Sequence, residues 1–125
     1  MKDEILIWSD GASRGNPGPG GWGVVIVSPE KEVVELGGGE DHTTNNRMEL
    51  MGAISALSFV SKNNFATPEK ILVHTDSNYV INGITKWVHG WIKNNWQTSQ
   101  KEDVINRDLW EELFSLTAGK KIEWK

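Results

Sequence analysis

Three acidic residues stand beside apolar segments rather than among other polar groups. Asp10 follows the apolar run 5–9 and Asp76 follows the run 71–75, so each marks the end of an expected strand. Glu49 lies in the first turns of an expected helix, with apolar residues on both sides. Two strand ends and a helix start can meet at one end of a sheet, where three carboxylates repel one another unless cations bind. The pattern indicates a candidate metal site.

Each of these acids also has a purely structural interpretation. Asp10 could form a turn, and Asp76 could cap the helix that follows it. Glu49 could form a capping pair with Asn46 at the start of its helix. The donor type limits the metal in any case. Oxygen ligands suit Mg²⁺ or Mn²⁺, whereas the chain has no cysteine and no paired histidines for zinc.

The elements that must position these acids follow from the hydrophobic pattern. Three short β-type runs early in the chain suggest an antiparallel meander, and a change to helical period follows. We expect residues 11–21 to form a long connection and Gly37–Gly39 to break the chain. The order of elements predicts a mixed α/β domain. The expected strands are 5–9, 22–27, 32–36, 71–75 and 121–125, and the expected helices are 44–62, 78–85, 87–94 and 106–118.

The glycine-rich segment 18–23 satisfies the pattern G-x-G-x-x-G, which is also found in dinucleotide-binding folds. In those folds the glycines follow a strand directly and open a helix. Here prolines precede and interrupt the glycines, and a β-type run follows them. A turn-rich connection explains the segment better than a dinucleotide site does.

Length and composition bound the class of protein. The 125 residues predict a single domain, 1–125, with room for its own core. The absence of cysteine and of any apolar run long enough to span a membrane favours a soluble, cytoplasmic protein without a membrane partner. The net charge of −4 argues against a generic basic nucleic-acid binder. However, residues 77–101 contain no acid, several lysines and three of the seven tryptophans, so this stretch is locally basic.

Four segments resemble the motifs of type 1 ribonuclease H, in the same order and spacing along the chain. They are Asp10-Gly11-Ala12-Ser13-Arg14-Gly15-Asn16-Pro17-Gly18-Pro19-Gly20-Gly21-Trp22-Gly23, Thr43-Thr44-Asn45-Asn46-Arg47-Met48-Glu49-Leu50, Thr75-Asp76-Ser77-Asn78-Tyr79-Val80 and Gly83-Ile84-Thr85-Lys86-Trp87. The resemblance implies a ribonuclease H-like fold, with a mixed sheet whose first three strands are antiparallel and with flanking helices.

The resemblance also implies an activity. A member of this family cleaves the RNA strand of an RNA–DNA hybrid as an endonuclease, leaving a 5′-phosphate and a 3′-hydroxyl. Asp10, Glu49 and Asp76 would be the catalytic residues and would hold two Mg²⁺ ions, with Mn²⁺ as a substitute. One ion would activate the attacking water and the other would stabilise the departing 3′ oxygen.

Substrate contacts are implied position by position. Five residues match those that read sugars and base edges in the minor groove, three match a channel for the DNA strand, and three match a grip on a DNA phosphate. Gly11 belongs to the substrate-binding set as well. In the order just given, the three groups are Ser13, Asn16, Asn45, Asn46 and Asn78; Tyr79, Trp87 and Trp91; and His42, Thr44 and Asn106.

The stretch 77–101 matches the family's basic protrusion, here called the handle. An alternative interpretation makes its tryptophans part of the core, and both can hold in part because residues at i and i+4 share a helical face. Ile92, Asn94, Asn95 and Gln97 occupy positions where strongly basic members carry Lys or Arg. We therefore expect weaker non-specific affinity for the hybrid.

The family continues beyond the last strand into a loop with a histidine and then a helix with a fourth carboxylate. This chain ends at Lys125, within that strand, so we expect the final helix to be missing. It is either a fragment or a naturally short protein, and the loop and helix that it lacks contribute to activity in the family. The partner expected is an RNA–DNA hybrid, bound by a monomer. The alternatives are a hybrid-binding module with little or no turnover, and an unrelated metal-binding or structural α/β domain.

Overall fold

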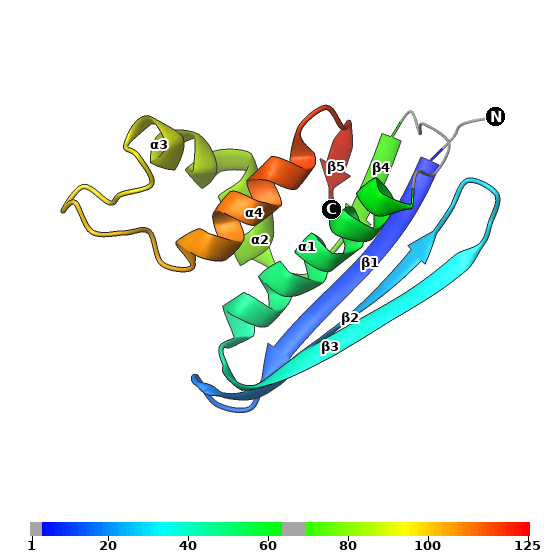
Figure 1. Ribbon diagram of the computed structural model, residues 1–125, viewed down its shortest axis with the longest axis horizontal. Coiled ribbons are helices and arrows are strands. Elements are labelled where there is room, and N and C mark those ends of the chain that lie inside the picture. The colour runs from blue at the N-terminus through cyan, green and yellow to red at the C-terminus, as the bar shows by residue number, and fades with distance from the viewer. Residues whose placement is uncertain (1–3, 64–69) are drawn as a thin grey trace.

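The computed structural model describes residues 4–63 and 70–125, which form a five-stranded sheet with helices packed on it (Figure 1). The strand order is β3-β2-β1-β4-β5; β1, β2 and β3 are antiparallel, and β4 is parallel to both β1 and β5. The predicted mixed sheet is confirmed. The strands are β1 (Glu4–Ser13), β2 (Gly18–Val27), β3 (Val33–Thr43), β4 (Lys70–His74) and β5 (Ile122–Trp124). The helices are α1 (Asn45–Lys62), α2 (Asn78–Asn82), the π-helix η1 (Gly83–Trp87), α3 (Val88–Lys93) and α4 (Arg107–Thr117).

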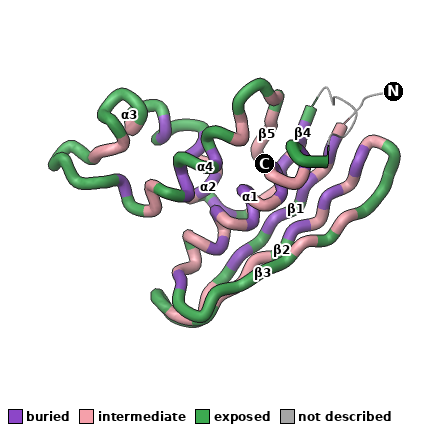
Figure 2. The backbone as a smooth tube through the Cα atoms, viewed as in Figure 1, coloured by how far each residue is buried: buried purple, intermediate pink, exposed green. Residues whose placement is uncertain are grey.

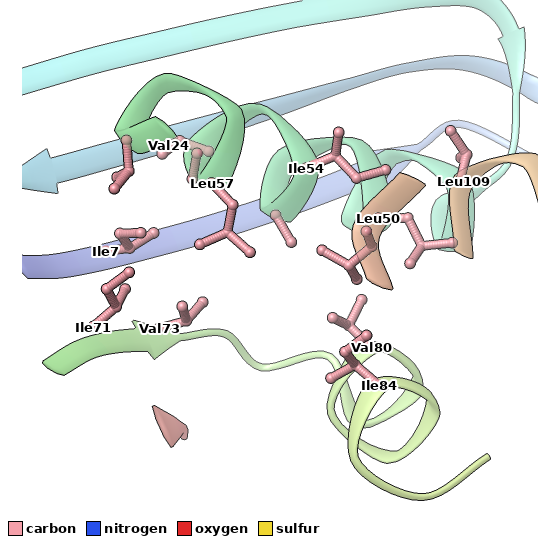
Figure 3. Close-up of a cluster of buried hydrophobic side chains, with 14 of the residues drawn as sticks. Ile7, Val24, Leu50, Ile54, Leu57, Ile71, Val73, Val80, Ile84 and Leu109 are labelled. Atoms are coloured by element: carbon pink, nitrogen blue, oxygen red, sulfur yellow. The ribbon is translucent and has the colours of Figure 1, made fainter. Parts of the chain in front are cut away.

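The core lies between the sheet and α1, with α4 packed against α1 (Figures 1 and 3). Alternation along β1 turns Ile5 and Ile7 towards α1, where both are fully buried. Leu50 and Leu57 of α1 are also fully buried against this face, and Figure 2 shows the buried segments along β1 and α1. Each such side chain contributes about 1.5–3 kcal/mol through burial, so α1 is held firmly on β1.

The other face of the sheet carries the alternate residues of β1. Trp8 is 43% exposed on this face and stacks on His74 of the neighbouring strand, with ring centroids 5.1 Å apart. Asp10 follows on the same face by alternation and is exposed. None of the helices within the described residues is long and apolar enough to cross a membrane.

The glycine-rich segments correct two predictions. Residues 11–21 are not a long connection, because β1 continues through Ser13 and β2 begins at Gly18; Asp10 therefore lies inside the strand. Gly37–Gly39 do not break the chain but pair with residues 21–23 inside β3. A Cβ at Gly38 would lie 2.8 Å from the ring of Trp22, so a larger residue would not fit there. Strand pairing and close packing override the local preference of glycine for turns.

The two helices expected at 78–85 and 87–94 form one continuous helical run through α2, η1 and α3. The π-turn lies where Gly83 packs directly against the buried ring of Trp110, in space that a side chain at position 83 would need. The helices expected at 44–62 and 106–118 and the strands expected at 71–75 and 121–125 are confirmed within one residue at each end, whereas β3 runs seven residues past the expected end at residue 36.

Candidate active site

Gly11 brings the strand with Asp10 against the helix with Glu49. A Cβ at Gly11 would lie 2.6 Å from the backbone nitrogen of Glu49, so the strand and the helix touch backbone to backbone at this point. One turn further along α1, a Cβ at Gly52 would lie 2.5 Å from the hydroxyl of Ser9. The lack of side chains at these glycines allows the backbone of α1 at Glu49 to lie against β1.

Strand register brings Asp76 to the level of Asp10. In the parallel pair of β1 and β4, Trp8 lies opposite His74, and each aspartate follows two residues later. The pairing with β4 ends there while β1 continues to Ser13, so β1 has an open edge beside Asp10. The sheet register and the glycine contact together bring the backbones of the three acids to the same end of the sheet.

The structure contradicts the structural interpretations of the three acids. The cap of α2 is Ser77, whose hydroxyl accepts a hydrogen bond of 3.1 Å from Val80, so Asp76 is not the cap. Thr44 caps α1 in the same way for Arg47, so the pair of Asn46 and Glu49 is not the cap. The carboxylate of Asp10 accepts from the backbone N–H of Gly11, within a strand rather than a turn. Other residues therefore perform the capping that these acids could have performed.

The three carboxylates are accessible and suited to a hard cation. Asp10 and Asp76 are exposed and Glu49 is partly exposed. In the ranges 4–63 and 70–125, none of the three forms a salt bridge, and no group of three acidic, histidine or cysteine residues is close enough to hold a metal ion as the side chains stand. The donor set is entirely oxygen, as Mg²⁺ and Mn²⁺ prefer, so the residues fit such an ion by chemistry and backbone placement. A hollow of about 380 Å³ beside Asp10 is lined also by Trp8, Gly23 and Glu35.

Three of the expected minor-groove residues meet where the β1–β2 turn approaches α1. The side-chain oxygen of Asn16 accepts from the backbone N–H of Asn45 at 3.1 Å, and it lies 3.3 Å from the hydroxyl of Ser13, which donates to the carbonyl of Gly15 at 2.7 Å. This fixes the amide of Asn16 with its NH₂ group available to a ligand. Asn46 and Asn78 are exposed in the first turns of α1 and α2, respectively.

Two of the expected phosphate-binding residues are joined through Arg47. Its backbone N–H donates to Thr44, and its guanidinium donates to the side-chain oxygen of Asn106 at 3.0 Å. Arg47 also donates twice to Asp108, at 2.8 and 3.1 Å, and this pairing lowers the pKa of Asp108 and raises that of Arg47. His42 is exposed near the end of β3, two residues before Thr44.

The expected channel residues belong to a continuous aromatic cluster. The ring centroid of Tyr79 lies 5.9 Å from that of Trp87 and 5.2 Å from that of Trp110. The ring centroid of Trp91 lies 5.3–6.3 Å from those of Trp87, Trp96 and Trp110. Trp87 is 41% exposed, whereas Trp91 and Trp96 pack in part against the core. The packing interpretation therefore holds for Trp91 and Trp96, and the exposed ring of Trp87 leaves the handle a surface that a ligand could reach.

Sequence reasoning missed three members of this site: Arg47, Asp108 and the fully buried Trp110. Arg47 lies inside the 43–50 motif, and Asp108 is an acid in the first turn of α4. Either could have been suspected from its position, but the pairing joins residues 61 positions apart.

Comparison with known proteins agrees with this fold. The RNase H family profile matches residues 2–125. The chain is 48% identical over 125 residues to the ribonuclease H of Paracoccus denitrificans (strain Pd 1222), covering 97% of this chain and 77% of that protein. Its structure matches LC9-RNase H1, a type 1 RNase H with the type 2 active-site motif, with TM-score 0.83 and 29% identity over 100% of this chain and 63% of that one. LC11-RNase H1, solved in complex with an RNA/DNA hybrid, shares the fold with TM-score 0.70 and 21% identity, over 97% and 83% of the two chains. The chain belongs to the ribonuclease H family.

Proposed function

We propose that this ribonuclease H hydrolyses the RNA strand of RNA–DNA hybrids with divalent ions held by Asp10, Glu49 and Asp76. The observations that support this proposal are the strand register, which sets Asp76 level with Asp10, and the contact of Gly11 with the backbone of Glu49. Mg²⁺ is the proposed ion and Mn²⁺ its substitute, because the donors are all carboxylate oxygens. When bound, such ions activate water and stabilise the leaving oxygen of a phosphodiester.

The chain's own residues bind and orient the hybrid. Asn16 and Asn45 form a polar surface at the turn next to β1, and we assign to it the recognition of the minor groove, where the RNA 2′-hydroxyl is accessible. The handle adds exposed lysines and the exposed ring of Trp87. We assign to it the phosphate backbone and sugars of the opposite strand. We further propose that the chain acts as a monomer in the cytoplasm.

A cleavage assay with separately labelled strands tests this proposal. The chain is incubated with an RNA–DNA hybrid, and with the same RNA single-stranded, in Mg²⁺, in Mn²⁺ and in EDTA. We expect metal-dependent cuts in the RNA of the hybrid, with 5′-phosphate ends and an intact DNA strand. In Asp10→Asn the rate should fall by more than about 100-fold, since even residues around a metal's ligands cost about 10–100-fold when replaced.

Glu35→Gln is the matched control, because Glu35 lines the same hollow as Asp10 but lies on β3. It should cleave like the original chain. Tight hybrid binding without cuts would show a binding module instead. Cuts that persist in Asp10→Asn would contradict the assignment of the metal ligands.

A further inference from the structure

The contact between Arg47 and Asn106 fixes which way the Asn106 amide points. Arg47 has only donors, so the Asn106 atom that it contacts at 3.0 Å must be the oxygen. The amide NH₂ of Asn106 then faces Tyr79, whose hydroxyl oxygen accepts from it at 3.1 Å. The chemistry of the guanidinium therefore determines the direction of the next hydrogen bond.

Trp110 fixes the hydroxyl of Tyr79 from a second side. The indole N–H can only donate, and it donates to the same hydroxyl oxygen at 3.1 Å. The Tyr79 hydroxyl oxygen thus accepts two hydrogen bonds from N–H groups that cannot accept one in return. The proton of its own hydroxyl must point away from both, and no acceptor for it occurs among the described residues.

The surroundings of Tyr79 determine which acceptor suits this proton. Tyr79 is only partly buried and lies beside the exposed ring of Trp87. No acidic residue occurs from 77 to 101, and the carboxylate of Asp108 is occupied by Arg47. An oriented donor without a partner among the described residues favours an anionic oxygen, because hydrogen bonds to ionised acceptors are the stronger ones.

We propose that Tyr79 donates its hydroxyl proton to a phosphate oxygen of the bound hybrid, and that Arg47 is the positioning residue that sets this polarity through Asn106. The inference rests on the proposed function, since it needs a bound hybrid. It gives Tyr79 a polar role in addition to the packing of its ring, and it gives Arg47 a role without contact with the substrate. Reversing one hydrogen bond in the series from Arg47 through Asn106 to Tyr79 should abolish the contact with the phosphate oxygen, although the Tyr79 hydroxyl remains.

The test compares binding of hybrids that carry one neutral methylphosphonate at successive positions of either strand. Binding is measured by fluorescence anisotropy in the Asp10→Asn background, which keeps the hybrid intact. The parent is the Asp10→Asn protein that retains Tyr79. At one position the neutral group should raise the Kd of the parent about tenfold more than it raises the Kd of the Tyr79→Phe variant. About tenfold is the loss expected for one hydrogen bond to a charged group. At all other positions the two losses should be equal.

Two further variants test the polarity. In Asn106→Asp, the new carboxylate can accept from both Arg47 and Tyr79, so the Tyr79 proton turns inward. This variant should lose the position-specific difference although it retains Tyr79. Arg47→Met should lose it as well, because the Asn106 amide is then free to rotate. Arg107→Met is the control and should keep the position-specific difference. It also removes one arginine charge, but Arg107 lies on α4 and pairs with Asp103 and Glu111.

Circular dichroism melts show which variants are folded, and Asn106→Asp and Arg47→Met each test the polarity independently. Equal losses for the parent and Tyr79→Phe at every position would overturn the inference. So would an unchanged difference in a folded Asn106→Asp or Arg47→Met. Failure of the original chain to cleave the unmodified hybrid is a separate result, which would contradict the proposed function.

Discussion

Gly11 and Glu49 lie in direct backbone contact, although one belongs to the central strand and the other to the helix above it. A Cβ at position 11 would lie 2.6 Å from the nitrogen of Glu49 and 2.5 Å from the carbonyl carbon of Met48, distances that real Cβ atoms do not adopt. The spacing of α1 from β1 at the candidate active site therefore depends on the absence of one side chain.

Gly11→Ala should push α1 away from β1 and separate Glu49 from Asp10. Overpacking of this kind costs about 1–3 kcal/mol of unfolding free energy, and RNA cleavage should fall with it. Urea unfolding and the cleavage rate measure the two effects. Gly37→Ala is the control, because a Cβ there meets only the Trp22 carbonyl at an ordinary 3.5 Å. Equal behaviour of the two variants would show that the contact at Gly11 is unimportant.

Asp76 and Ser77 are adjacent but should separate function from stability. Ser77→Ala removes the cap of α2 and should lower the unfolding free energy by about 1 kcal/mol. Asp76→Asn should leave the melting temperature unchanged or slightly raised, since it removes a like charge, yet abolish cleavage. Thermal melts and cleavage rates of both variants check this. A marked loss of stability in Asp76→Asn would indicate a structural role for the carboxylate.

The pair of Asp108 and Arg47 predicts a dependence of stability on pH. Arg47 lowers the pKa of Asp108 below its ordinary value near 3.8, so the pair stabilises the fold above that pH. This contribution is lost as the pH falls through the lowered pKa. Because Asp108 is largely exposed, Asp108→Asn should cost only about 0.5–1 kcal/mol at pH 7. Urea titrations of both proteins at a series of pH values from 7 downward should show this difference shrinking once the pH falls below 3.8; a difference that stays constant with pH would exclude the ion pair as its cause.

The handle should gain affinity when positive charge is added. Ile92 is 39% exposed and Asn94 is exposed, so lysines at these positions can reach a phosphate backbone. The double variant Ile92→Lys/Asn94→Lys should lower the KM for the hybrid and steepen its dependence on salt by about two released counterions. KM measured across a range of KCl concentrations tests this. An unchanged KM and salt slope would mean that the handle does not contact the hybrid.

Much of this site could be predicted because its signals are local. Asp10, Glu49 and Asp76 each stand out against an apolar neighbourhood, and the helical period around Glu49 is clear over 45–62. The predictions for the glycine segments are wrong because glycine usually marks turns. A glycine is needed at position 38 inside β3 because the ring of Trp22 occupies the space that a side chain would take. Trp22 belongs to the neighbouring strand, so this requirement cannot be seen in the local sequence.

The polar series from Arg47 to Tyr79 was also beyond sequence reasoning. Asn106 adopts a left-handed backbone conformation with φ of 62°, just before α4, and this aligns its amide with partners on α1 and α2. Neither the conformation nor the partners leave a periodic trace in the sequence. Such contacts depend on how the helices pack, which local patterns do not specify.

Calorimetric titration of the free protein with Mn²⁺ tests most directly whether the three carboxylates act as one site. The chain should bind Mn²⁺ without nucleic acid, and Asp10→Asn, Glu49→Gln and Asp76→Asn should each weaken binding by at least about tenfold. Glu35→Gln should bind as the original chain does. No binding by the original chain, or unchanged binding in the three variants, would contradict the account.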